Sequence, residues 1–535
     1  MFRKRDFFIW LLLGMLVLLW IPYNIHAAES INPSHRKIVK IQVESQEEIQ
    51  ELANLGEPWE VHKDYVIIDV TDKLMQKITD RGFSVEVLFY SLEEFSYPGP
   101  LPKAGPEGLY HSYSELKDEL LQLEQTYPQI AKVYDIGDSW EKTQGIADRD
   151  IWAIKISDNV TQEEDEPEIL FIGAHHAREW ISVEVPLYLA KYLVENYYTD
   201  PMVRSYVDNT QIWIVPMLNP DGHQYSIDVD RWWRKNRRSN GGGSYGVDLN
   251  RNYGYMWGGP GSSPDPQSDI YRGTAPFSEP ETQAIRDLAL AHKFRAMLTY
   301  HSYGQLILYP WGYTYNPPPD VLALSNMSAD MADLIQQVHG SIYTPQQASQ
   351  LYLTSGTTDD WFYGQLDTFG FTIELRPVGY PYFILPEDQI IPTWEENRPV
   401  ALYLISWSQM PVNPIPDVKA NGSDGPLTIK SSDNLFVTIE LTPGNFSGHN
   451  ADWWVLADTS PFGWYYYNVN TGSWFPGQLV TYQGGLFNLP SYGVLNTTGL
   501  PTGTYTFYFG VDGNMNGSID MGVLVYDGVV VNITP

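Results

Sequence analysis

The chain contains no cysteine in its 535 residues. Disulfide bonds, cysteine-based metal sites and a cysteine nucleophile are therefore excluded. Any metal ion must be held by His, Asp or Glu side chains. If the protein is exported, its stability must come from packing or bound ions rather than from disulfides.

Basic residues are scarce: 33 Lys and Arg stand against 65 Asp and Glu, a formal net charge of -32. Nucleic acids are bound by clustered Lys and Arg that displace counterions from phosphates, so a nucleic-acid partner is not expected. The charge suits a soluble, self-repelling secreted protein.

Long apolar runs are absent after the first 28 residues. Arg3, Lys4 and Arg5 precede an apolar run from Phe7 to Ile21, and the small residues Ala27-Ala28 follow. This order predicts a signal peptide over residues 1–28, a secreted protein and no stable membrane insertion after cleavage. The run approaches the length of a bilayer span, so an uncleaved anchor is the alternative.

The length predicts two or three domains. Residues 29–106 alternate between strand patterns at 38–43, 65–70 and 83–88 and helix patterns that begin at Ser45 and at about Thr71, which indicates a small α+β unit. They end in a Pro/Gly-rich linker over 97–106. Residues 107–410 carry longer helices and apolar strands, typical of an α/β domain with a mixed or largely parallel sheet. Residues 411–535 are rich in Thr, Tyr, Val, Gly and Asn, which predicts an all-β sandwich.

A His-x-x-Glu pair, His176 and Glu179, follows the strand-like run 169–172 directly. An imidazole and a carboxylate suit Zn²⁺, although alone the pair fits a helix-start salt bridge as well. His301 ends another predicted strand, and ligands gather at the carboxyl ends of strands in α/β sheets. Two histidines and a glutamate form a three-ligand zinc site whose fourth position is open to water, as in catalytic sites.

Glu374 lies in the otherwise apolar strand 371–375. Burial there would raise its pKa toward a value useful for a general base. The alternative is a buried structural ion pair with a residue such as Arg376.

Many separated motifs between about Tyr110 and Met410 resemble, in type and order, those of zinc metallocarboxypeptidases of the pancreatic carboxypeptidase A/B type. They are His176-Ala177-Arg178-Glu179-Trp180-Ile181, Asn219-Pro220-Asp221-Gly222, residues 231–237, 246–252 and 277–281, His301-Ser302-Tyr303, Leu308-Tyr309-Pro310, Tyr352 and Glu374-Leu375-Arg376. The resemblance implies a secreted enzyme that hydrolyses the last peptide bond of peptides or proteins with one zinc ion.

The resemblance also implies residue roles. His176, Glu179 and His301 would be the zinc ligands, and Glu374 the general base that later protonates the leaving amine. Arg234 would stabilise the oxyanion, and Asp248 would orient His176. The substrate would be bound by Arg178, Asn250, Arg251, Tyr303, Tyr352 and Asp359, with Asn250, Arg251 and Tyr352 on its terminal carboxylate. The motif register selects His176 over the adjacent His175, whose side chain would point the other way.

Asp359 falls where this family places the residue at the base of the side-chain pocket. A carboxylate buried without a cation is costly, so we expect a preference for C-terminal Lys or Arg. A paired or hydrated Asp359, giving a broad pocket of mixed specificity, is the alternative.

The first unit resembles the inhibitory prosegment of these enzymes, which implies a zymogen and an activating protease that cuts near Lys103. The alternative is a permanently attached folding aid. In the last domain, Asp512, Asn514, Asn516 and Asp520 alternate as in a calcium loop, but Val523 stands at the final bidentate position, and a plain Asn/Gly turn fits too.

Two other functions are compatible with the pattern. One is a noncatalytic zinc-binding or peptide-binding homologue, which would have no need of Glu374 or Arg234. The other is an amidase acting on cell-wall peptides, which would not need the carboxylate-binding residues Asn250, Arg251 and Tyr352.

Overall fold

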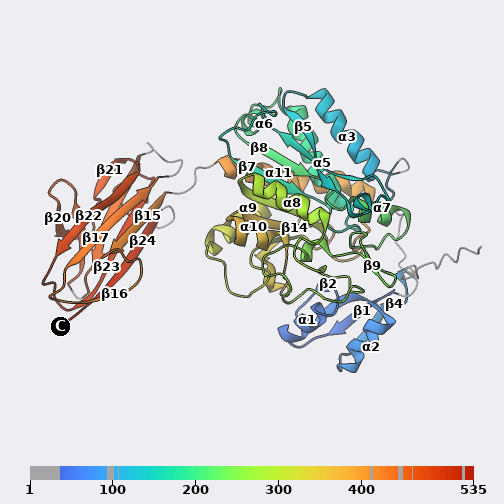
Figure 1. The fold of residues 1–535 in the computed structure, drawn as a ribbon, viewed down its shortest axis with the longest axis horizontal. Coiled ribbons are helices and arrows are strands. Elements are labelled where there is room, and N and C mark those ends of the chain that lie inside the picture. The colour runs from blue at the N-terminus through green and yellow to red at the C-terminus, as the bar shows by residue number, and fades with distance from the viewer. Residues whose placement is uncertain are drawn as a thin grey trace, which may run out of the picture. The chain divides into compact units, whose positions relative to one another are not determined.

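The computed structural model describes residues 36–92, 102–105, 108–409, 414–443, 450–460, 462–520 and 524–535. The predicted signal peptide and most of the predicted linker lie outside these ranges. Within them, none of the helices combines the length and apolar character needed to cross a bilayer. The chain divides into two compact units, one up to Ile405 and one from Ser406 (Figure 1).

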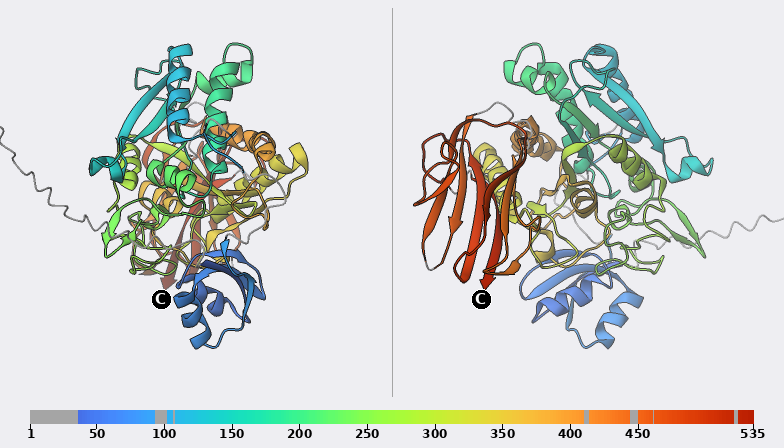
Figure 2. Two further views of the ribbon diagram at one scale, coloured as in Figure 1. Left: turned by 90° about the vertical axis from the view of Figure 1, so that its right-hand side faces the viewer. Right: turned by 60° about the vertical axis from the view of Figure 1, so that its left-hand side comes forward.

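The first described segment is a four-stranded antiparallel sheet in the order β2-β3-β1-β4. Its elements are β1 (Arg36–Gln42), α1 (Gln46–Ala53), β2 (Pro58–Val61), β3 (Tyr65–Thr71), α2 (Asp72–Asp80) and β4 (Val85–Phe89). Ser45 caps α1 by accepting a hydrogen bond from the Glu48 N–H at 3.3 Å. In both views of Figure 2 this sheet lies against one side of the larger α/β body.

That body is built on an eight-stranded sheet in the order β13-β12-β14-β11-β7-β8-β6-β5. The strands are β5 (Ala131–Asp138), β6 (Asp150–Ile156), β7 (Glu168–Ile172), β8 (Gln211–Val215), β11 (Phe294–Ser302), β12 (Leu306–Tyr309), β13 (Thr344–Gln347) and β14 (Phe369–Leu375). The four central strands β14, β11, β7 and β8 are parallel, while β6, β5 and β12 join antiparallel. The predicted α/β fold with a mixed sheet is confirmed.

The described part of this body also contains helices. They are α3 (Tyr113–Thr126), α4 (Trp140–Thr143), α5 (Ile181–Asn196), α6 (Pro201–Val207), α7 (Pro220–Asp228), α8 (Pro280–Ala291), α9 (Val321–His339), α10 (Thr358–Leu366) and α11 (Ile390–Gln409). Every residue of β7 and β8 is buried, as expected for parallel strands covered on both faces. One core cluster joins Leu170 and Ile172 of β7 to Ile285 of α8 and Phe362 of α10. A two-stranded hairpin, β9 (Ser239–Gly241) and β10 (Ser244–Tyr245), lies outside the sheet.

The unit from Ser406 is a β-sandwich. Its smaller sheet has β15 (Ile415–Ala420), β17 (Leu435–Thr442) and β22 (Leu489–Thr497). Its larger sheet has β16 (Leu427–Lys430), β18 (Asn450–Asp458), β19 (Trp464–Asn468), β20 (Ser473–Pro476), β21 (Tyr482–Gly485), β23 (Gly503–Asp512) and β24 (Val525–Thr534). Val437, Trp453 and Phe507 meet in a core drawn from both sheets.

Candidate active site

The three predicted metal ligands lie at the carboxyl ends of neighbouring parallel strands. Gly173 directly follows β7, and a Cβ there would lie 2.2 Å from the Ser182 carbonyl oxygen, so a larger residue does not fit. Ala174 then adopts a positive φ of 53°, which redirects the chain before α5. His301 is the penultimate residue of β11 and pairs in register with Glu374 of β14.

His176, Glu179 and His301 converge as a buried group. The two Nδ1 atoms of the histidines lie 3.1 Å apart, and the Glu179 carboxylate lies 2.8 Å from the first and 3.1 Å from the second. A tetrahedral zinc ion with Zn–N bonds of 2.0–2.1 Å would separate two nitrogens by about 3.3 Å. Among candidate metal-binding groups in the described part of the chain, this one alone is entirely buried. The donor set and spacing therefore fit zinc.

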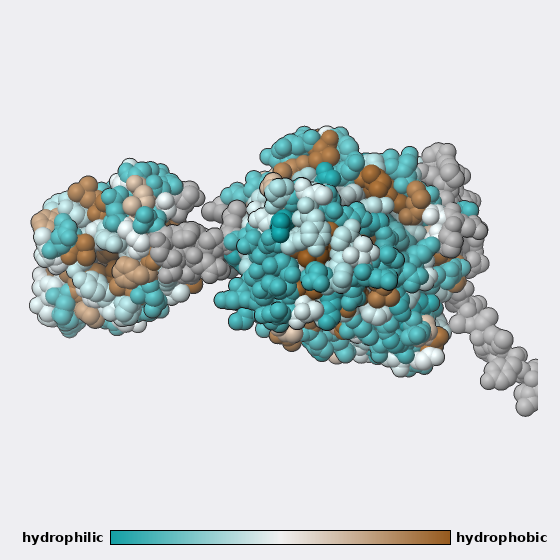
Figure 3. All heavy atoms as spheres, turned by 90° about the horizontal axis from the view of Figure 1, so that it is seen from above, coloured by the Kyte–Doolittle hydropathy of each residue, from teal (hydrophilic) through white to brown (hydrophobic). Residues whose placement is uncertain are grey.

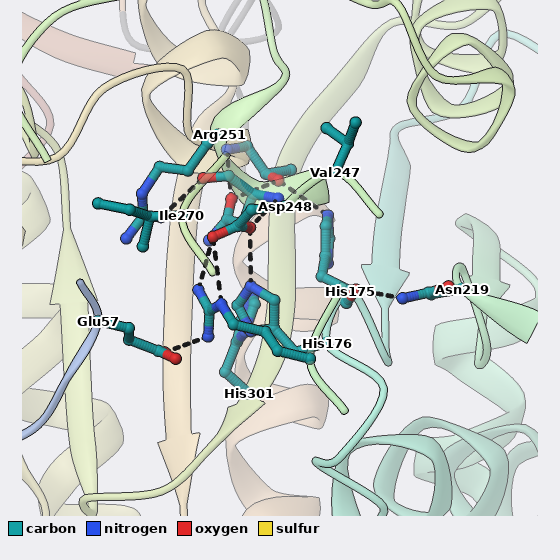
Figure 4. Close-up of polar contacts among 12 residues, drawn as sticks. Glu57, His175, His176, Asn219, Val247, Asp248, Arg251, Ile270 and His301 are labelled. Atoms are coloured by element: carbon teal, nitrogen blue, oxygen red, sulfur yellow. Dashed lines mark hydrogen bonds and ion pairs between the residues drawn. The ribbon is translucent and has the colours of Figure 1, made fainter. Parts of the chain in front are cut away.

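Asp248 connects the metal ligands to Arg234. Its Oδ1 lies 3.2 Å from Nε2 of His176, and its Oδ2 accepts from Nε and Nη2 of Arg234 at 3.2 and 2.9 Å (Figure 4). Burial alone would favour the neutral acid, but Arg234, Arg251 and His176 hold the pKa of Asp248 well below its usual range. The Asp248 carboxylate thereby fixes both the His176 ring and the Arg234 guanidinium.

A cavity of about 380 Å³ contains the predicted reaction site. The three metal ligands line it together with Arg234, Asn250, Arg251, Tyr352, Asp359 and Glu374. Burial and the neighbouring carboxylates of Glu179 and Glu57 raise the pKa of Glu374 well above its usual value, despite Arg234. Arg376 does not pair with Glu374: its Nε donates to Glu396 at 2.8 Å, which argues against the structural ion pair considered from sequence.

Asp359, on the first turn of α10, is 4% exposed and lines the same cavity. Burial raises its pKa. Among the residues that the structure describes, no cation pairs with it. Its neighbour Asp360 has a structural role instead, because it accepts from the backbone N–H groups of Gly312 and Tyr313 at 2.9 and 3.1 Å.

Comparison with known proteins agrees with this geometry. The family model described as zinc carboxypeptidase matches residues 116–400. The chain belongs to the zinc carboxypeptidase family. Carboxypeptidase B of Astacus astacus is 38% identical over 294 residues, covering 54% of this chain and 93% of that protein. Carboxypeptidase A2 of Mus musculus is 36% identical over 293 residues, covering 54% and 68%.

Solved structures share the fold. Carboxypeptidase A from Helicoverpa armigera superposes with a TM-score of 0.60 at 26% identity, covering 70% of this chain and 98% of that one. Thrombin activatable fibrinolysis inhibitor gives a TM-score of 0.57 at 26% identity, covering 70% and 99%. The predicted family and its metallopeptidase class are confirmed.

The N-terminal sheet reaches into the active-site cavity of this carboxypeptidase. Glu57, just before β2, forms ion pairs with Arg178 and Arg234. Trp59 of β2 stacks on Trp232 with ring centroids 5.5 Å apart. Sequence reasoning missed Glu57 and β2, because a four-residue strand that begins with proline shows no alternating pattern.

The two remaining substrate-binding candidates also contact this sheet. Tyr352 packs against its core cluster, and α1 holds the residues on either side: Gln46 donates to the Leu351 carbonyl at 3.1 Å, and Gln50 exchanges hydrogen bonds with Leu353. Tyr303 lies in an apolar cluster that includes Trp59. The N-terminal sheet therefore covers both tyrosines.

The calcium prediction is not supported. Asn514 and Asn516 each direct an amide N–H₂ group to Asp520 at 2.8 Å, and Asp512 accepts from Trp454 and from the Asn514 N–H. The loop side chains thus satisfy one another, and within the described residues they form no convergent group of three acidic ligands.

Proposed function

We propose that this enzyme removes the C-terminal residue of peptides and proteins by zinc-dependent hydrolysis, with a preference for lysine or arginine or a mixed specificity. One observation carries the proposal: a buried His176–Glu179–His301 group, Glu374 and Arg234 share one cavity. The donor set is that of a catalytic zinc site, which has three protein ligands.

In the proposed mechanism, zinc, when bound by these ligands, lowers the pKa of water and polarises the scissile carbonyl. Glu374 takes a proton from the attacking water and later gives it to the leaving amine. Burial and the carboxylates of Glu179 and Glu57 raise the pKa of Glu374, and a higher pKa makes a carboxylate a stronger base. Arg234 donates to the oxygen on which negative charge develops, an effect typically of about 3 kcal/mol per donor.

Asn250, Arg251 and Tyr352 would hold the terminal carboxylate of the substrate, so that only the last peptide bond reaches Glu374. A guanidinium binds a carboxylate well because its planar donors match the two oxygens. Beneath them, Asp359 is buried without a cationic partner in the described structure, which supports a cationic side chain as its natural partner.

We further propose that the chain is exported as a zymogen. Residues 1–28 would direct secretion, 29–106 would act as an inhibitory prosegment, 107–410 would be the catalytic domain, and 411–535 an accessory domain. The Glu57 ion pairs with Arg178 and Arg234 support inhibition, because they engage the residues proposed to bind substrate and oxyanion. An activating protease would cut the linker near Lys103.

The test is a panel of peptides that differ only in the last residue, incubated with the full chain before and after limited trypsin treatment. Mass spectrometry of the products should show stepwise loss of C-terminal residues after treatment, fastest for Lys and Arg. Internal fragments without released C-terminal amino acids would exclude the carboxypeptidase activity. Faster release of Leu or Phe would exclude only the basic preference.

A further inference from the structure

His175 lies beside the zinc site without belonging to it. The residue is fully buried, and its ring stacks on that of His301 with centroids 5.2 Å apart and planes inclined by 24°. Its Nδ1 lies 3.2 Å from Oγ1 of Thr299, and its Nε2 lies 2.9 Å from Oγ1 of Thr358 and 3.0 Å from the hydroxyl oxygen of Tyr253. The nitrogens of His175 therefore face Thr299, Thr358 and Tyr253, while the face of its ring packs on the predicted metal ligand His301.

Thr358 in turn holds Asn250. Both its backbone N–H and its hydroxyl donate to Oδ1 of Asn250, at 2.9 and 3.0 Å. Because a backbone N–H can only donate, the atom of the Asn250 carboxamide that faces it must be the oxygen. The opposite end of the carboxamide, the NH₂ group, is left as the donor, and Asn250 lines the cavity.

The hydroxyl of Thr358 has one proton. Because that proton goes to Asn250, the Thr358 oxygen is left as an acceptor. It accepts from His175 when the proton of the neutral imidazole is on Nε2, and the Tyr253 hydroxyl, 3.0 Å from the same nitrogen, then shares that donor. Nδ1 of His175 then accepts from Thr299. With this tautomer the four side chains form a series of hydrogen bonds that runs from Thr299 to His175 to Thr358 to Asn250, with Tyr253 as a branch at His175. Bonds in such a series strengthen one another.

We propose that Thr358 and His175 are positioning residues that fix the Asn250 carboxamide with its NH₂ group toward the carboxylate of the substrate. The inference rests on the proposed function, because it assigns Asn250 to carboxylate binding. Neither residue touches the reacting atoms: each acts through Asn250. Since His175 also packs on His301, the same series joins the carboxylate-binding residues to a zinc ligand.

The test compares Thr358→Val, which keeps the shape and loses the hydroxyl, with Thr358→Ser, which keeps the hydroxyl. The full chain is activated by trypsin and assayed with acetyl-Phe-Lys and acetyl-Phe-Leu. Loss of one such hydrogen bond should raise KM about tenfold in Thr358→Val while kcat changes less than twofold, and Thr358→Ser should stay near wild type. His175→Gln, which retains an N–H donor, should raise KM less than His175→Phe does.

A binding measurement separates this inference from the activity. Calorimetry with L-lysine and L-leucine, and with their carboxamides, should show about tenfold weaker binding of the two acids by Thr358→Val and unchanged binding of the amides, at wild-type zinc content. The positioning role would be overturned if Thr358→Val lost equal affinity for the acids and the amides, if it lost zinc, or if its affinity for both kinds of ligand were unchanged. A wild-type protein that binds the acids yet releases no C-terminal residue would refute the proposed function instead.

Discussion

Glu374 is the residue whose replacement should cost the most activity. In Glu374→Gln the side chain keeps its size and burial but cannot take a proton, so kcat should fall between about 10²-fold and 10⁴-fold. Zinc content should stay unchanged, because Glu374 is not among the three converging ligands. Steady-state kinetics and metal analysis measure both.

The matched control is Glu395→Gln, which removes a partly exposed carboxylate on α11 that pairs with His339 at 2.9 Å. It should leave kcat within about twofold, as surface substitutions have small effects. Turnover of Glu374→Gln at the wild-type rate would show that another group accepts the proton.

Asp359 should set the choice of C-terminal residue. Asp359→Leu should reduce kcat/KM for lysine relative to leucine about a hundredfold, because a buried cation loses its partner. Burial raises the pKa of Asp359, so its ionised fraction falls at acid pH. In the wild type, preference for lysine over leucine should therefore grow as pH rises, measured with paired peptides. A ratio independent of both the substitution and pH would show that Asp359 does not contact the substrate.

At the scale of elements, β2 and the turn before it line the cavity, and we predict that they limit access to it. Glu57→Gln removes the charge that pairs with Arg178 and Arg234. Without these buried ion pairs the N-terminal sheet should be held less tightly over the cavity, because their loss is costly. We therefore expect the peptidase activity of the uncleaved full chain to rise about tenfold or more. Activity after trypsin treatment should match that of the wild type, because the segment has then been removed.

Glu86→Gln on β4 is the control for that experiment. β4 and β2 are the two edge strands of the same sheet, and Glu86 is exposed. The uncleaved variant should be as inactive as the uncleaved wild type. Equal basal activity of Glu57→Gln and Glu86→Gln would mean that the Glu57 ion pairs do not restrain the enzyme.

The alternating apolar pattern predicted β1, β3 and β4, because each has several residues that alternate or lie buried on the helix-covered face. β2 escaped prediction. Its four residues are Pro58, Trp59, Glu60 and Val61, and their structure depends on pairing with β3 and on packing of Trp59 against Trp232. Such contacts join residues far apart in sequence, which local patterns do not report.

At the scale of the whole molecule, zinc should stabilise one unit and not the other. A ligand present at a hundredfold excess over its Kd stabilises the folded state that binds it by about 2.7 kcal/mol. Removing zinc with a chelator should abolish turnover and lower the Tm of the α/β unit by about 5 °C or more. The β-sandwich transition should not move.

Differential scanning calorimetry of the full chain, before and after chelation, measures the Tm of both units and so tests whether zinc stabilises the α/β unit alone. Adding back zinc should restore both activity and Tm, whereas Mg²⁺, which prefers an octahedral set of oxygen ligands, should restore neither. A chelated protein with unchanged Tm and full turnover would contradict a zinc site at His176, Glu179 and His301.

The surface of the α/β unit agrees with its composition. It is predominantly hydrophilic in the view of Figure 3, and its apolar side chains lie in separate patches. A net charge of -32 disfavours close approach of two such molecules.

The sequence by itself determined the fold class, the family and the zinc-type ligand pattern. Strand and helix periods follow from which residues are apolar, and His176, Glu179 and Glu374 stand in local motifs that remain recognisable without a structure. The absence of cysteine already limited the metal ligands to His, Asp and Glu.

The tertiary structure decided which other residues lie in contact with those motifs. Parallel pairing of β11 and β14 brings His301 beside Glu374, and the N-terminal sheet carries Glu57 to two arginines more than a hundred residues away. Asp359 and Asp360 are neighbours in the chain and both are buried, but Asp360 accepts hydrogen bonds from the backbone of Gly312 and Tyr313, whereas Asp359 lines the cavity. These outcomes depend on long-range packing and on the electrostatics of buried groups, which no local stretch of sequence contains.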